Sequence, residues 1–154
     1  MTITIKPHHL LDVYKLYGRG IYPFSPDEKF GHDFYLVGNY LINHQVKSVI
    51  FTAHSDDICR PCRYLKNGVC NDELDLAEFR TKNDYNLMID QKLLFDFQWK
   101  ENTSYQLDHL LSSIVEQATP ELFCKVWSYS AVDDSILRFT QTLNGVKRYL
   151  QCGN

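Results

Sequence analysis

The chain has 154 residues, of which 44% are apolar and 14% aromatic, and its 16 basic and 19 acidic side chains leave a net charge of −3. That length and apolar fraction suffice for one globular domain with its own core, so a metal is not needed merely to hold the fold. The sequence has no block of Lys and Arg, which disfavours nucleic-acid binding, and no run approaches the roughly 18 apolar residues of a membrane span.

The N-terminal segment lacks the cationic region, apolar core and cleavage site of a secretory signal. We therefore expect a soluble, cytoplasmic protein that binds neither membrane nor nucleic acid. In that reducing compartment, an odd number of cysteines, five, is expected to serve metal or redox chemistry rather than structural disulfides. The partner, a small molecule or another protein, is not indicated by the sequence.

The first third of the chain alternates predicted strands with predicted helices. Residues 2–6 alternate polar and β-branched apolar side chains and predict a short strand, and residues 8–17 predict an amphipathic helix closed by a glycine. A capping Ser followed by Pro predicts a second helix over residues 26–44, in which apolar side chains recur at 4-3-4-3 spacing. Residues 46–53 are rich in β-branched residues and predict a second strand. The intervening helices allow a parallel pairing of the two strands without demanding it.

The remainder of the chain is predicted to be helical outside its cysteine-rich loop. The acidic residues 72–78 are expected to be helical, and residues 85–97 form a further helix rich in Leu and aromatic side chains. Residues 107–118 fit the amphipathic helix template at nearly every position. A Thr-Pro-Glu capping pattern begins another helical turn at residue 119.

A 3-4-3-4 apolar spacing over residues 136–150 predicts a C-terminal helix, and Asn144-Gly145 leaves open whether it is continuous. The sequence contains no repeat and no linker. The predicted fold is therefore mostly α, within the α+β class. It is a single helical domain over residues 1–154, with at most a small two-stranded sheet and a cysteine-rich metal loop.

The cysteine-rich loop is the most informative stretch, because Cys59, Cys62 and Cys70 lie within twelve residues at C-x2-C-x7-C spacing. Two thiolates separated by two residues can turn both sulfurs toward one point. The dipeptide Asn67-Gly68 predicts a turn that folds the third cysteine back onto the first pair. Structural core thiols have no reason to gather in a polar, turn-rich loop, so the spacing predicts a metal site.

A closed tetrahedral site needs a fourth ligand beside these three thiolates. Cys124, on the predicted helical segment that begins at residue 119, is the first candidate, although its apolar neighbours suit a core residue equally well. A nitrogen from His54 or His9 is an alternative. Cys152 lies near a terminus that is expected to fray and is the poorest candidate.

Zinc and an iron-sulfur cluster both accept thiolates, so the number of ligands alone does not separate them. Zinc ribbons carry two C-x2-C pairs and this chain has one, whereas a cluster accepts irregular spacing because its ligands sit on different irons. We expect an iron-sulfur cluster, with 4Fe-4S favoured, and a structural zinc module as the alternative. With three cysteine ligands, one iron would keep a free coordination position that could bind a small substrate. The sequence does not decide whether the protein is such an enzyme.

A redox function is a further interpretation of the same loop. Cys59-Arg60-Pro61-Cys62 follows an apolar strand, as does the C-x-P-C motif of thioredoxin-like enzymes, in which a helix N-terminus lowers the pKa of the first thiol. Against this interpretation, the further strands of a βαβ frame are not predicted and Cys70 would have no role.

Three strings carry a resemblance to a known family: Lys6-Pro7-His8-His9-Leu10-Leu11, then Phe30-Gly31-His32, then Asp56-Asp57-Ile58-Cys59-Arg60-Pro61-Cys62 with Cys70 beyond. They resemble a domain-of-unknown-function family of small bacterial and archaeal proteins suggested to bind iron-sulfur. The resemblance covers about the first half of the chain.

Many members of that family place a Cys directly after the His-His-Leu-Leu string, where this chain has Asp12. The resemblance therefore implies that Asp12 or Cys124 takes the fourth position, or that the site stays three-coordinate. It also implies that His8 or His9 lies beside the metal, as a ligand or just behind the ligands. In an enzyme, these histidines or His32 would move protons.

Overall fold

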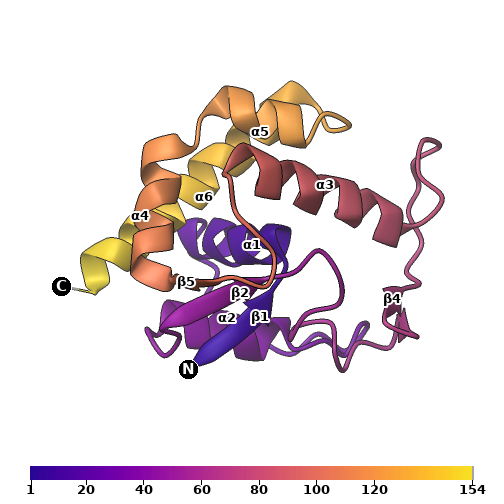
Figure 1. Ribbon diagram of the computed structural model, residues 1–154, viewed down its shortest axis with the longest axis horizontal. Coiled ribbons are helices and arrows are strands. Elements are labelled where there is room, and N and C mark those ends of the chain that lie inside the picture. Colours follow the sequence, from indigo (N-terminus) through magenta and orange to yellow (C-terminus); the bar gives the residue numbers. More distant parts are fainter. Residues whose placement is uncertain (154) are drawn as a thin grey trace.

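A computed structural model describes residues 1–153 (Figure 1). Its elements follow in the order β1 (Thr2–Ile5), α1 (Pro7–Gly18), α2 (Phe34–Ile42), β2 (Ser48–Phe51), β3 (Leu65–Lys66), β4 (Val69–Cys70), α3 (Lys82–Asp96), β5 (Ser104–Gln106), α4 (Leu107–Gln117), α5 (Pro120–Val126) and α6 (Val132–Cys152). The predicted class, a mostly helical single domain with little sheet, is confirmed.

The main sheet has the strand order β1-β2-β5. β1 and β2 pair in parallel, with Ile5 opposite Phe51, and β5 pairs with β2 in the antiparallel direction. The two strands predicted from the sequence are therefore present, but the expected limit of two strands is wrong. The third strand has three residues, and so short a segment shows no period from which it could be predicted.

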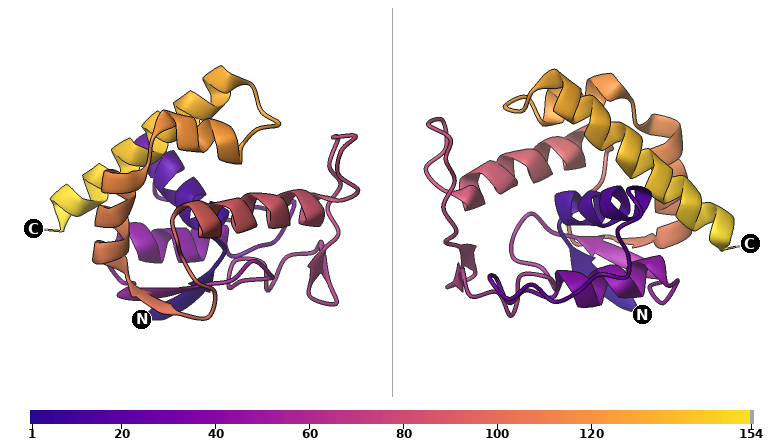
Figure 2. Two further views of the ribbon diagram at one scale, coloured as in Figure 1. Left: turned by 45° about the horizontal axis from the view of Figure 1, so that its top comes forward. Right: turned by 180° about the vertical axis from the view of Figure 1, so that it is seen from behind.

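Helix α1 lies at the centre, between the sheet and α6 (Figures 1 and 2). Its inward face is fully buried at Leu10, Val13 and Tyr14. It packs most extensively on α6, and the two helices approach so closely that a Cβ on Gly145 would lie 1.7 Å from the Tyr14 carbonyl oxygen. Helix α6 is continuous through Asn144-Gly145, because here the glycine admits a neighbouring backbone rather than ending the helix.

The second helix begins at Phe34, eight residues later than the sequence pattern predicts. The expected capping role of Ser25 is replaced by a local turn in which the Asp27 carboxylate accepts the backbone N–H groups of Lys29 and Phe30 at 2.8 and 3.0 Å. Gly31 then adopts a φ of +67°, which interrupts any helix. These residues form a loop instead, and that loop reaches the site described below.

The acidic residues 72–78, predicted to be helical, form a loop. They offer no apolar stripe to bury, and neighbouring carboxylates repel one another. Asp72 is bound to the ammonium of Lys82 at 2.8 Å instead. Helix α3 begins only at Lys82, where the Thr81 hydroxyl caps it by accepting the Asp84 N–H at 3.1 Å.

The longest helix of the described chain, α6, has 21 residues and carries exposed charges such as Asp133 and Lys147. None of the helices within residues 1–153 combines the length and the apolar character that a membrane crossing needs.

The contact between α1 and α6 predicts a large effect for Gly145→Ala. The added methyl group has no space against the α1 backbone, so the helices must separate and the free energy of unfolding should fall by about 3 kcal/mol. Chemical denaturation followed by circular dichroism measures this change. Asn144→Ala, at an exposed neighbouring position, is the control and should stay within about 0.5 kcal/mol of the wild type. Equal stability of the two variants would contradict the close approach.

Candidate metal centre

The site lies at the edge of the sheet where the parallel strands β1 and β2 both end. Lys6 and α1 follow the first strand, and the cysteine loop follows the second, so the parallel pairing brings the two segments together. Two carboxylates of the loop reach back across this edge. Asp57 accepts the Thr4 N–H at 2.9 Å, and Asp56 accepts the Lys6 N–H at 2.7 Å.

Asp56 is the most connected side chain of the site and is only 2% exposed. Its Oδ1 accepts the backbone N–H groups of Ile58 and Cys59 at 3.1 and 3.0 Å, and its Oδ2 lies 2.7 Å from His9 Nδ1. Burial alone would raise the pKa of this carboxyl, but His9 and the N–H donors hold it well below its usual range. One carboxylate therefore fixes the position of Cys59 relative to His9.

A second carboxylate orients the neighbouring histidine. Asp90 on α3 has no exposed surface, and both of its oxygens lie 2.9 Å from His8 Nδ1. It also accepts the His8 backbone N–H at 2.8 Å. Asp90 is not among the site residues predicted from the sequence. A signal was present, because this acid lies on the buried face of α3 beside Ile89 and Leu93, where a charge requires a partner.

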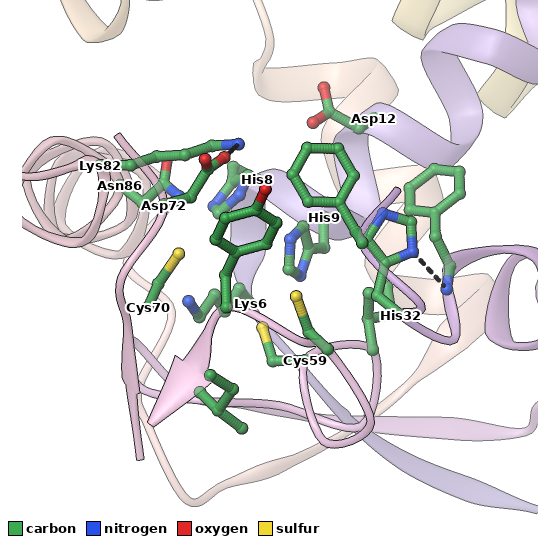
Figure 3. A pocket seen from close by; sticks show the side chains of 16 residues that line it. Lys6, His8, His9, Asp12, His32, Cys59, Cys70, Asp72, Lys82 and Asn86 are labelled. Atoms are coloured by element: carbon green, nitrogen blue, oxygen red, sulfur yellow. Dashed lines mark hydrogen bonds and ion pairs between the residues drawn. The ribbon is translucent and has the colours of Figure 1, made fainter. Parts of the chain in front are cut away.

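In both pairs a carboxylate, which can only accept, contacts Nδ1, so Nδ1 carries the proton and Nε2 keeps a lone pair. The two rings are 4.2 Å apart and both line the pocket (Figure 3). Burial lowers the pKa of His9 more than Asp56 raises it. For His8, burial also opposes protonation, but Asp90 outweighs it and raises the pKa. His9 is thus the better lone-pair donor of the two.

The three clustered cysteines line the same pocket. Asn67 and Gly68, at φ values of 52° and 76°, form the predicted two-residue turn between β3 and β4, which places Cys70 opposite Leu65. In Figure 3, Cys59 and Cys70 approach from the loop side, whereas His8 and His9 approach from α1.

The loop that replaces the start of the predicted second helix closes another side of the site. The Asp33 N–H binds the Ile58 carbonyl at 3.0 Å, and the Arg63 N–H binds the Phe30 carbonyl at 2.7 Å. His32 stacks on Phe30, with ring centroids 5.4 Å apart, and lines the pocket. All three strings that carry the family resemblance therefore meet at one place.

The pocket has a volume of about 270 Å³. Its lining combines thiols, imidazoles, ammonium groups, carboxylates and apolar side chains. These are Lys6, His8, His9, Asp12, Phe30, His32, Phe34, Ile58, Cys59, Cys62, Tyr64, Leu65, Cys70, Asp72, Lys82 and Asn86.

One group of potential metal ligands is already close together: atoms of His9, Asp56 and Cys59 lie within 4.8 Å of one another. Cys62 and Cys70 line the pocket but do not belong to this group. Two ligands of one tetrahedral zinc stand about 3.8 Å apart, given a Zn–S bond of about 2.3 Å. The three thiols line one pocket without all lying within 4.8 Å of one another.

The other predicted ligands occupy different positions. Asp12 lines the pocket, but its carboxylate is paired with Arg138 at 2.7 Å and Lys15 at 3.3 Å. Cys124 lies on α5 and Cys152 at the end of α6, and neither lines the pocket. His54 is exposed outside it.

The geometry argues against thioredoxin-like chemistry. Burial, together with the Asp56 carboxylate, raises the pKa of the Cys59 thiol to about 12, the opposite of an activated nucleophile. The chain after Cys59 forms turns rather than the helix that follows the first thiol in the thioredoxin-like motif.

The two histidines of the metal-free protein are predicted to titrate on opposite sides of the ordinary value of 6.5, His8 above it and His9 below it. In Asp90→Asn the opposing carboxylate is gone, so burial should bring the pKa of His8 below 6.5. NMR titration of the ring protons measures both values. Asp84→Asn, at an exposed position on the same helix, should leave them unchanged. A His8 pKa unaffected by Asp90→Asn would contradict the pairing.

Comparison with known proteins gives no relative from which a role of these residues could be inferred. No family model, no curated protein and no solved structure matches this chain.

Proposed function

We propose that the chain is an iron-sulfur protein in which Cys59, Cys62, Cys70 and His9 hold a 4Fe-4S cluster. The observation that carries the proposal is that three thiols and a carboxylate-oriented imidazole line one pocket. Thiolates are the usual ligands of iron-sulfur clusters, and histidine replaces cysteine in some of them. A cluster also suits the reducing cytoplasm that the five free cysteines indicate.

The spread of the ligands supports a cluster over a single zinc ion. A zinc site closed by four ligands draws them to about 3.8 Å from one another and leaves no hollow between them. Here Cys62 and Cys70 stand outside the close group, around a volume of about 270 Å³. A cluster has ligands on different irons, and Cys62 and Cys70 supply two such separate positions beside the close pair of His9 and Cys59. Structural zinc on His9, Cys59 and a further cysteine is the alternative.

Orientation and charge favour His9 as the fourth ligand over Asp12 and Cys124. Asp56 fixes the His9 ring with Nε2 free, which is the arrangement that metal-binding histidines adopt. Asp12 is already neutralised by Arg138 and Lys15, and Cys124 does not line the pocket.

A bound cluster would supply electron transfer or, at an iron with a weak ligand, a Lewis acid. Around it, Asp56 and Asp90 orient the two imidazoles, and Phe30, Phe34 and Ile58 limit the access of water. The buried pair of His8 and Asp90 also supports a second candidate, an enzyme acting on a small substrate. In that case His8 Nε2 would hold or move the proton.

Serine substitution of each pocket cysteine tests the first candidate. Anaerobically purified wild-type protein should contain iron and acid-labile sulfide in equal amounts near four per chain. Cys59→Ser, Cys62→Ser and Cys70→Ser should each lose most of both, because the hydroxyl is a poor ligand for iron.

The matched controls are Cys124→Ser and Cys152→Ser, which should retain the wild-type iron and sulfide because neither thiol lines the pocket. A colourless protein with one zinc per chain would overturn the cluster in favour of the structural alternative.

The role of His9 is tested by pulsed EPR of the reduced protein labelled with ¹⁵N-histidine. A strong coupling from a nitrogen bound to iron should be present in the wild type and absent in His9→Ala. His109→Ala, at an exposed position on α4, should retain it. A cluster that shows no such coupling in the wild type, or that is lost in Cys124→Ser, would assign the fourth position to another residue.

A further inference from the structure

Lys6 is a buried cation beside the candidate metal ligands. The residue is only 4% exposed, and its side chain lines the pocket. Figure 3 shows its ammonium between Cys70 and Cys59, below the two histidines. Burying an ammonium is costly unless a negative group compensates it.

No carboxylate supplies that compensation within residues 1–153. Asp56 binds the Lys6 backbone N–H rather than its ammonium, and the ammonium takes part in none of the ion pairs of the described chain. The other ammonium of the pocket, on Lys82, is matched by Asp72 at 2.8 Å. Lys6 is therefore the cation of the pocket whose charge is left for a ligand.

The surroundings of Lys6 favour an anion as well. The residue directly precedes α1, whose twelve residues begin at the pocket, so the positive end of the helix dipole lies at the same place. Tyr64 and Asn86 line the pocket and offer hydrogen-bond donors. The metal-free pocket has a volume of about 270 Å³, near the lower limit for small-molecule sites, and a bound cluster would leave part of it for a small anion only.

We propose that Lys6 is the anion-binding residue of this pocket and that its ligand is a small oxyanion, a carboxylate or phosphate group held beside the metal centre. The inference rests on the proposed function for the position of the ligand next to the cluster, whereas the anion site itself is built from protein groups alone. It names the class of substrate for the enzyme candidate: a small molecule bearing a carboxylate or phosphate.

Phosphate and malonate are the probes, titrated separately into metal-free and iron-loaded protein. NMR of the His8 and His9 rings follows the metal-free form, and calorimetry follows the loaded form. Saturable binding of at least one anion is expected in both forms. Lys6→Met removes only the charge from a stem of similar length and should weaken the affinity about tenfold or more. Lys66→Met, at an exposed position on β3, should not change it.

A second measurement does not depend on the stability of Lys6→Met. In wild-type protein the ¹⁵N resonance of the Lys6 ammonium should shift with the same saturation as the histidine signals. Absence of saturable binding, or equal affinity in Lys6→Met, would overturn the proposal. Binding that disappears once iron is loaded would also overturn it, because Lys6 would then serve only the charge of the cluster. Failure of the cluster is detected by iron and sulfide analysis, whereas failure of the anion site is detected by the titration of metal-free protein. The two failures are therefore distinguishable.

Discussion

The buried carboxylate of Asp56 is the interaction on which the site depends. It joins the end of β1, the first turn of α1 and the start of the cysteine loop through hydrogen bonds to Lys6, His9, Ile58 and Cys59. Because a buried carboxylate without donors would be strongly destabilising, these segments are constrained to arrive together. The position of the Cys59 thiol relative to an imidazole is thus set by the fold before any metal binds.

The fold supplies the frame for this arrangement. The parallel pairing of β1 with β2 brings two segments, separated by about fifty residues in the chain, to one edge of the sheet. Helix α1 is held on its other side by the glycine contact with α6, and α3 contributes Asp90 to His8. A pocket with histidines from a rigid helix and thiols from a loop and a hairpin follows from this geometry.

Local sequence patterns predicted the elements whose side chains show a clear period, namely α1, α3, α4, α6 and the two parallel strands. The turn at Asn67-Gly68 was predictable because both positions need a left-handed backbone. What could not be predicted depends on a local turn that replaces a helix or on contacts between distant residues. Asp27 and Gly31 divert the chain from a helix into the loop that carries His32, and Gly145 sits within a continuous helix because α1 passes against it. The pairing of Asp90 with His8 and the unmatched charge of Lys6 appear only when α3 is packed against α1.

The proposed cluster is tested most directly by an anomalous difference map, recorded at the iron absorption edge, from crystals grown anaerobically. One compact peak is expected inside the pocket, within bonding distance of Cys59, Cys62, Cys70 and His9 Nε2. An iron peak elsewhere in the molecule, or an anomalous signal that appears only at the zinc edge, would contradict it.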